Sequence, residues 1–437
     1  MNNKKIKEHI KSAVLIILIV GSLFLTWSIW TYQPQYAEAP NAEYVQNVAI
    51  GDQQALNDVI QPVVAIYHGQ AGMTGTMRRN QVENLFALLK RSQFGEVKEL
   101  NPEVEGVEYE NLIDQQVEFI MSTPLPLSLL DQWLLVEREV AETGTFDRMI
   151  VDTSQPTARL LFVSFADKAI YAAPIRDLNQ AAFNEEVNRI LTGAPAFFAY
   201  EPNLDTRIYL PEGNVDVPKL TYSTMHLSAG KFRDALFSNP SLVKKDTGDS
   251  GEELYTDGTR LLRVYNDQQR LAYINPVQNS FGQLSGEDLI LRSHDFIDDH
   301  AGWTDTYRLY DYSLPGQFAS YRLYIDQYPV FQTKGMYGFS SLYVSFKSSD
   351  IYEYVRLMSR LRFEFDRNNV VLDSGRELIA QLRAQNQFDE DRIQDIKIGY
   401  EMTRQPNTNP VILSFQPVWY IKHDQSWQKL IPPAEGS

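Results

Sequence analysis

The feature that most constrains this chain is an uninterrupted apolar run close to its amino terminus. Residues 13–30 read AVLIILIVGSLFLTWSIW, and no charged residue occurs between Lys11 and Glu38. A run of this length can cross the hydrocarbon core of a bilayer as a helix. Its eleven Leu, Ile, Val and Phe side chains favour insertion by roughly 3 to 6 kcal/mol. The sequence therefore predicts a transmembrane helix over residues 13–32.

The residues on either side of the run predict its orientation. The first basic residue after it is Arg78, whereas four basic residues precede it: Lys4, Lys5, Lys7 and Lys11. Because the positive end of a span stays in the cytoplasm, we expect residues 1–12 to form a cytoplasmic tail and residues 33–437 to lie outside the cell. Three aromatic residues then form a belt at the outer interface: Trp27, Trp30 and Tyr32.

A cleaved signal peptide is the competing interpretation of this segment. Ala37-Glu38-Ala39 resembles the small-residue site at which signal peptides are cut. The apolar run is longer than the usual signal-peptide core of about 7–15 residues, and Pro40 follows the site directly. Both observations favour a permanent anchor.

One face of the predicted helix carries small polar residues. Ser22 and Thr26 lie four residues apart, so they share a face. Small polar side chains let helices approach and hydrogen-bond in lipid. We therefore predict a transmembrane interaction face, with the alternative that the hydroxyls bond back to carbonyls of their own helix. The face comprises Leu15, Leu18, Ile19, Ser22, Thr26 and Ile29.

Length, cysteine content and charge bound what the rest of the chain can be. A chain of 437 residues is longer than a single core usually grows, so two or three domains are expected. The absence of cysteine excludes disulfides and thiolate chemistry. The formal charge is −16 and residues 1–12 carry +3, which leaves −19 outside the membrane. Nucleic acid is therefore not an expected partner.

Hydrophobic patterns predict an α+β body of three domains, at residues 33–205, 206–285 and 286–437. Strand-like runs of apolar residues alternate irregularly with amphipathic helical segments, as in an α+β fold. Paired runs predict two hairpins, and a polar stretch at 201–205 suggests the first boundary. We expect strands at 63–69, 116–122, 158–165, 169–175, 196–200, 207–210, 259–265, 270–274, 321–325, 341–346 and 417–422, and helices at 78–93, 179–191, 288–300 and 376–385, with one more after Leu227.

A short internal sequence repeat suggests that the last two domains are similar to each other. The stretch at 227–231, LSAGK, precedes FRDALF, and the stretch at 372–376, LDSGR, precedes ELIAQL. Both predict a polar cap that opens an amphipathic helix. Duplication of the last two domains is the hypothesis that follows.

The search for catalytic or metal-binding motifs yields none that has its required context. Residues 244–253, KKDTGDSGEE, contain two protease-like strings but neither partner residues nor an apolar setting, so they predict a solvated loop. His294 and His300 are six residues apart on the expected helix at 288–300, which places them roughly 120° apart around the helix axis. A zinc-binding pair of histidines is instead spaced four residues apart, on one face. We expect His300 to be a satisfied core histidine. The sequence indicates no enzyme, no catalytic residue, no cofactor and no metal.

Several strings together resemble the YycH family, whose members regulate the cell-wall-controlling sensor kinase YycG (WalK) of Gram-positive bacteria. The resemblance spans nearly the whole chain, and its specificity comes from the order and spacing of the strings. They are 26–34 (TWSIWTYQP), 255–258 (YTDG), 296–305 (FIDDHAGWTD), 328–331 (YPVF), 398–402 (IGYEM) and 417–421 (PVWYI).

The resemblance implies a fold, a location and a set of partners. It implies a single-pass protein of the cell membrane whose last two external domains are similar to each other and to the companion protein YycI. It also implies a non-enzymatic role in a complex with YycI and the kinase, formed largely through transmembrane helices. The alternative function is a membrane-anchored binding module for cell-wall fragments or peptides, which would use an aromatic groove of the external body.

Overall fold

The chain separates into two compact units, Met1–Asn47 and Val48–Ser437. The computed structural model describes few residues of the first unit and most of the second. These are residues 15, 18, 19, 21–23, 48–100, 109–137, 143–276, 282–331, 340–385, 387–405, 408 and 410–430.

The first half of the second unit is built on a nine-stranded antiparallel sheet. Its strand order is β11-β10-β2-β1-β5-β7-β8-β9-β4. The strands are β1 (Val64–Gly69), β2 (Gly72–Thr76), β4 (Lys98–Leu100), β5 (Val117–Pro126), β7 (Thr145–Asp152), β8 (Arg159–Ser164), β9 (Ala169–Pro174), β10 (Ala196–Asn203) and β11 (Thr206–Pro211). A separate parallel pair joins β3 (Gln93–Phe94) to β6 (Leu135–Val136).

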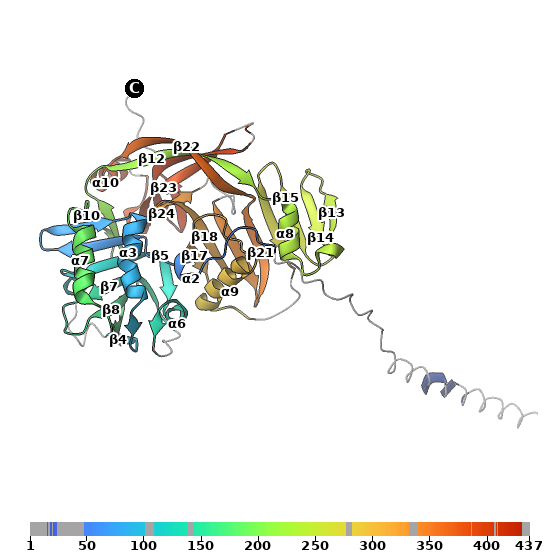
Figure 1. The fold of residues 1–437 in the computed structure, drawn as a ribbon, viewed down its shortest axis with the longest axis horizontal. Helices are drawn as coiled ribbons and strands as arrows, with labels where there is room; N and C mark the ends of the chain where they lie inside the picture. The colour runs from blue at the N-terminus through green and yellow to red at the C-terminus, as the bar shows by residue number, and fades with distance from the viewer. Residues whose placement is uncertain are drawn as a thin grey trace, which may run out of the picture. The chain divides into compact units, whose positions relative to one another are not determined.

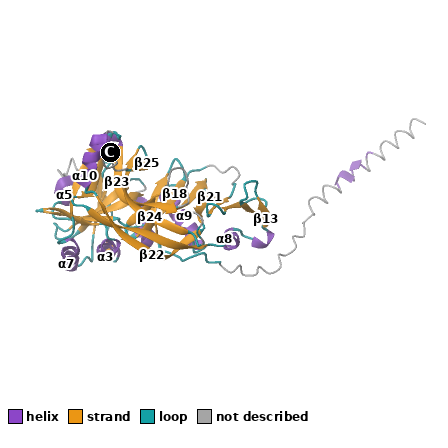
Figure 2. Ribbon diagram, turned by 90° about the horizontal axis from the view of Figure 1, so that it is seen from above, coloured by secondary structure: helices purple, strands orange, loops and turns teal. Residues whose placement is uncertain are grey.

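Helices cover both faces of this sheet. On one face lie α3 (Arg79–Lys90) and α7 (Gln180–Leu191), whose apolar sides join the main core together with Met149 and Val151 of β7. On the other face, α5 (Tyr109–Ile113) packs on Ile150 in a smaller core. The two sides are visible in Figure 2. Since both faces are covered, the central strands are apolar on both sides. Two shorter helices, α2 (Leu56–Val59) and α6 (Leu130–Trp133), complete this half.

The second half is built on a fourteen-stranded sheet. The main strand order is β13-β14-β15-β16-β21-β20-β18-β19-β23-β24-β12-β22, with β17 beside β18 and β25 beside β24. The strands are β12 (Val215–His226), β13 (Lys244–Thr247), β14 (Glu253–Thr256), β15 (Leu261–Tyr265), β16 (Arg270–Ile274), β17 (Tyr307–Ser313), β18 (Phe318–Ile325), β19 (Tyr328–Phe331), β20 (Ser341–Lys347), β21 (Asp350–Leu357), β22 (Ser359–Leu372), β23 (Ile393–Arg404), β24 (Ile412–His423) and β25 (Ser426–Lys429).

Three helices of the second half begin at polar caps. Ser228 caps α8 (Ala229–Leu236), and Ser285 caps α9 (Gly286–Asp299) by accepting from an amide of the first turn. In α10 (Gly375–Gln385), Ser374 and Glu377 bond to each other's backbone amides. This reciprocal pair is a capping box. The predicted polar caps of α8 and α10 are therefore confirmed.

The long strands β12 and β22 pair antiparallel from Val215–Leu372 to His226–Ser359 and lie side by side in Figure 1. The helices α8 and α10 each follow one of these two strands. The two sheets share one hydrophobic core. Polar contacts also join them, among them Arg308 of β17 with Glu83 of α3 at 3.1 Å.

Most of the expected elements are present, and the α+β class is confirmed. The hairpin of β8 and β9 and the hairpin of β15 and β16 form with the expected pairing. The expected strands end with the one at 417–422, and this end point is wrong, because β25 follows it. The strands of residues 206–285 and 286–437 meet in one sheet through the β12–β22 and β16–β21 pairs. The three-domain division and the duplication stay predictions.

Candidate functional site

The nine-stranded sheet buries a charged network that we call the Glu118 cluster. The side chain of Glu118 is fully buried, and Arg148 is only 3% exposed. Because a carboxylate only accepts, all four neighbours donate to it. Arg148 lies 3.1 Å from one carboxylate oxygen, and His68 lies 2.8 Å from the other. Two tyrosine hydroxyls complete the set, those of Tyr109 and Tyr209.

These donors hold Glu118 in its charged form. Burial alone would raise the pKa of Glu118, but the hydrogen bond from His68 and the charge of Arg148 outweigh burial and lower this pKa to about 2. Burial likewise opposes the charge of Arg148, yet the surrounding oxygens raise its pKa well above the usual value. The cluster is therefore an ion pair with its hydrogen bonds satisfied.

The fourteen-stranded sheet buries a second arginine in what we call the Arg356 cluster, which comprises His300, Gly302, Thr304, Asp305, Tyr354 and Arg356. Arg356 is fully buried and forms no ion pair with any residue in the part of the chain that the structure describes. Its guanidinium instead donates to oxygens of Gly302, Thr304, Tyr354 and Leu357. Neutral dipoles thus solvate this cation.

Two titratable groups beside Arg356 have shifted pKa values. Burial and the charge of Arg356 lower the pKa of His300 to about 3, so its imidazole is neutral at physiological pH. Burial raises the pKa of Asp305 to about 6, although the backbone N–H of Leu361 donates to its carboxylate. The charged forms of these two side chains are therefore less stabilised in the Arg356 cluster than the charged form of Glu118 is in the Glu118 cluster.

The structure refines the prediction for the histidines of α9. His294 is buried and its Nε2 lies 2.8 Å from the carbonyl oxygen of Gln54. His300 is buried against the rings of Phe296 and Tyr354, as expected of a core residue. Its Nε2 has no hydrogen-bond partner among the described residues. The expectation of a satisfied histidine is therefore wrong in this respect, because the ring packs against aromatic faces that offer no acceptor.

The protease-like strings lie on the surface. Residues 244–247 form β13, every residue of which is exposed, and the chain turns at Gly251 into β14. Exposure is as expected, but the segment is a hairpin rather than a loop. Across the described ranges from residue 48 to residue 430, no group of three or more His, Asp or Glu side chains is arranged to hold a metal ion.

A polar hollow of about 710 Å³ lies at one end of the nine-stranded sheet. It is enclosed by the turn between α5 and β5, the turn between β7 and β8, and the helix α7. We call it the amide hollow because six of its lining side chains are amides: Asn111, Gln115, Gln116, Gln155, Asn184 and Asn188.

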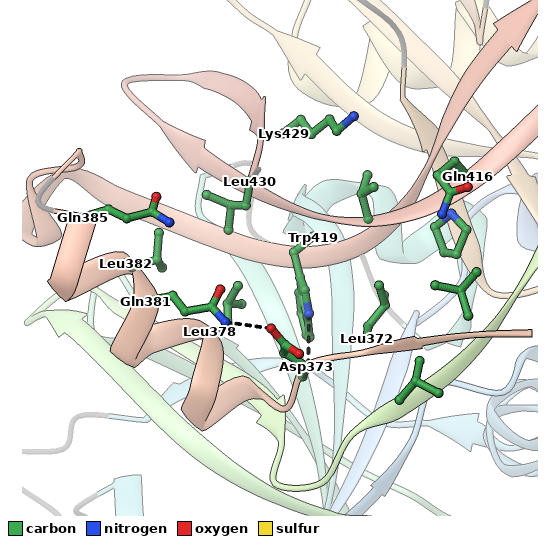
Figure 3. A pocket seen from close by; sticks show the side chains of 14 residues that line it. Leu372, Asp373, Leu378, Gln381, Leu382, Gln385, Gln416, Trp419, Lys429 and Leu430 are labelled. Atoms are coloured by element: carbon green, nitrogen blue, oxygen red, sulfur yellow. Dashed lines mark hydrogen bonds between the residues drawn. The ribbon is translucent and has the colours of Figure 1, made fainter. Parts of the chain in front are cut away.

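A second hollow, of about 370 Å³, lies between α10, the end of β22 and the middle of β24. Figure 3 shows Leu378 and Leu382 of α10 facing Trp419, whose indole N–H donates to the carbonyl oxygen of Asp373 at 3.1 Å. The amide of Gln381 donates to the Asp373 carboxylate at 2.7 Å. This mostly apolar lining suits a ligand's apolar side chain, in contrast to the amide hollow.

The predicted transmembrane face falls only in part on described residues. Leu15, Leu18 and Ile19 are helical, with exposed fractions of 59%, 64% and 51%, and Ser22 is helical as well. Thr26, Ile29 and the belt of Trp27, Trp30 and Tyr32 lie outside the described residues. No helix within the described residues has both the length and the apolar character that crossing a membrane requires.

Sequence patterns did not predict the Glu118 cluster, the Arg356 cluster or the amide hollow. The signal for Glu118 was a single acidic residue inside the apolar run at 116–122, whereas Arg148 lies on β7, which was not among the expected strands. Their pairing depends on β5 and β7 being neighbours, with Phe119 opposite Met149. Such pairing between distant segments leaves no local motif.

These features place the protein in a class, that of strand-rich α+β proteins with two joined sheets. Comparisons with known proteins identify its family. The model of the YycH protein N-terminal domain matches residues 8–191, and that of the YycH protein C-terminal domain matches residues 205–433. The chain belongs to the YycH family.

YycH of Bacillus subtilis resembles the chain both in sequence and in structure. It is 23% identical over 433 residues to the two-component system WalR/WalK regulatory protein YycH of Bacillus subtilis (strain 168), covering 95% of this chain and 94% of the relative. The crystal structure of YycH from Bacillus subtilis superimposes with a TM-score of 0.73 at 19% identity, covering 87% of this chain and 98% of the other. The resemblance to the YycH family is thereby confirmed, and the structural match agrees with the mixed α+β class.

Proposed function

We infer that this protein is a non-enzymatic regulator of a two-component system, anchored in the cell membrane, that modulates a sensor histidine kinase controlling the cell wall. The observation that carries this proposal is the match, over nearly the full length of both chains, to a WalR/WalK regulatory protein. The matched region begins at residue 8 and so includes the predicted anchor.

The proposed mechanism uses the transmembrane helix as the contact with the kinase. Residues 13–32 pack against helices of the kinase and of YycI, and the external body biases that packing. A regulator that binds one of two kinase states more tightly shifts their populations. Coupling of this kind typically amounts to about 1 to 3 kcal/mol. Ser22 and Thr26 are the residues whose small size permits close helix approach.

The test replaces these two residues in the full-length protein. Ser22→Leu with Thr26→Leu adds bulk to the face, so we expect association with the kinase in membranes and the transcriptional output of the system both to change. Ser28→Leu is the matched control, because residue 28 lies roughly 120° around the helix from residue 22. Unchanged association and output in the double variant would refute the proposed face.

Topology is tested separately. Protease added to intact cells is expected to digest the body and leave a membrane-protected fragment that contains residues 1–32. Release of the mature protein into the medium, with an amino terminus at Pro40, would contradict the anchor.

The alternative function is an anchored binding module for cell-wall fragments or peptides. The amide hollow favours this alternative, because six amide side chains offer both donors and acceptors in one place. The two functions are compatible, since a ligand on the external body can bias a kinase complex.

A further inference from the structure

The innermost wall of the amide hollow is buried and already hydrogen-bonded. Gln116 is 7% exposed and Asp152 is 3% exposed. The side-chain oxygen of Gln116 accepts from the backbone and the hydroxyl of Thr153, at 2.9 and 3.1 Å. Asp152 accepts from Ser154 and, through two nitrogens, from Arg159. These bonds fix the shape of the hollow before any ligand arrives.

The outer wall, in contrast, presents amides with free hydrogen-bonding capacity. Four exposed side chains have no hydrogen-bond partner among the described residues: Asn111, Gln155, Asn184 and Asn188. They come from three separate segments of the chain and converge on one hollow. Each amide offers two N–H donors and one carbonyl acceptor. Together they match a ligand whose surface alternates donors and acceptors, which is the property of a hydroxyl-rich molecule.

The charge of the site selects against anionic ligands. Arg159 is paired with Asp152 at 2.7 Å, so neither side chain offers an unbalanced charge. Asp114 remains as the acidic residue of the wall, and the body as a whole is strongly acidic. Anions are repelled by this field. A peptide would need apolar subsites, but two of the three apolar lining residues, Leu112 and Val187, are already buried in the cores.

We propose that the amide hollow binds a neutral, hydroxyl-rich ligand of the oligosaccharide class. A volume of about 710 Å³ lies within the range typical of ligand sites. Tyr67 supplies the aromatic surface on which the apolar face of a sugar ring can pack. Binding at this site does not depend on the proposed regulation of the kinase, and it is measured without the kinase.

The test is calorimetric titration of the full-length protein in lipid nanodiscs with N-acetylchitotetraose, a neutral tetrasaccharide. We expect saturable binding in the millimolar range or tighter. Asn184→Leu with Asn188→Leu removes two amides from the exposed side of α7 and should weaken binding about tenfold. Asn80→Leu with Asn84→Leu is the matched control. It changes two exposed amides at the same spacing on α3, outside the hollow, and should leave affinity and melting temperature unchanged.

Three results would overturn the proposal. They are the absence of saturable binding by the wild-type protein, equal weakening by the α3 control pair, and preferential binding of an alanine tetrapeptide or of an anionic uronic-acid tetrasaccharide. If saccharide binding fails while Ser22→Leu with Thr26→Leu still alters kinase association, the regulatory function stands and the ligand site alone is rejected.

Discussion

Each of the two sheets buries an arginine, and the two arginines have different partners. In the nine-stranded sheet, Arg148 is paired with the carboxylate of Glu118, which three other donors also contact. In the fourteen-stranded sheet, Arg356 donates only to neutral oxygens. A buried ion pair becomes a liability when one partner is lost, because the other charge stays buried without compensation. The Glu118 cluster should therefore be the more sensitive of the two to substitution.

The largest effect is expected at Arg148. Arg148→Met leaves the carboxylate of Glu118 buried without its cation, which should reduce the free energy of unfolding by about 3 to 5 kcal/mol. Urea denaturation measures this loss. The double variant Glu118→Gln with Arg148→Met should lose less than the sum of the two single variants, because the partners act as a unit. Additive losses would show that the pair is not coupled.

Acid should lower the free energy of unfolding because Glu118 becomes protonated. Its folded pKa of about 2 lies below the ordinary value of 4.5. The contribution is therefore present above about pH 4.5 and is lost as the pH falls toward 2, by up to about 3 kcal/mol. Denaturation at several pH values between 2 and 5 measures the slope. Glu118→Gln should flatten this slope, and an unchanged slope would place the acid sensitivity elsewhere.

A smaller loss is expected at Arg356. Arg356→Met removes several hydrogen bonds from a charged donor, and the nearby Asp305 carboxylate, whose pKa burial raises to about 6, can take up a proton once the cation is gone. We expect a loss of about 2 kcal/mol, less than that of Arg148→Met. Denaturation of the two variants under identical conditions compares them directly. If Arg356→Met is the more damaging, solvation of a cation by neutral oxygens is worth more in this protein than an ion pair.

The smallest effect at neutral pH is expected at His300. Since its Nε2 has no partner among the described residues, His300→Phe should change the free energy of unfolding by no more than about 1 kcal/mol at pH 7. The wild-type protein and the variant should differ in stability at acidic pH. The folded pKa of about 3 lies below the ordinary 6.5, so stability is lost as the pH falls from 6.5 toward 3. His300→Phe should remove that loss, and thermal melts between pH 4 and 7 would detect it.

The sequence was informative where one segment determines its own structure. A helix was expected at 179–191, and α7 forms there with Asn179 as its N-cap. The apolar runs at 158–165 and 169–175 predicted β8 and β9, which pair as expected. The class of fold and the family resemblance were therefore accessible from local patterns and short strings.

The sequence was uninformative where distant segments supply the stabilisation. The strand β22 reads SRLRFEFDRNNVVL and was not among the expected strands. Leu361, Phe363 and Phe365 alternate with charged residues in its first half, yet the strand is mostly exposed, and Phe363 and Phe365 are among its exposed residues. It is a strand because β12 supplies a complete ladder of partners. The amide hollow was not predicted for the same reason, because its lining residues come from four segments with no shared motif. Burial of Glu118 was hidden as well, since its donors lie on other strands and on α5.

The pairing of β12 with β22 has a consequence for biogenesis. Val215 finds its partner in Leu372, and β24 also comes from the last part of the chain. During synthesis the partners of β12 leave the ribosome much later than β12 itself, and contacts so far apart in sequence form slowly. The nine-stranded sheet, whose strands end at Pro211, can assemble first and serve as the base on which the later sheet is completed.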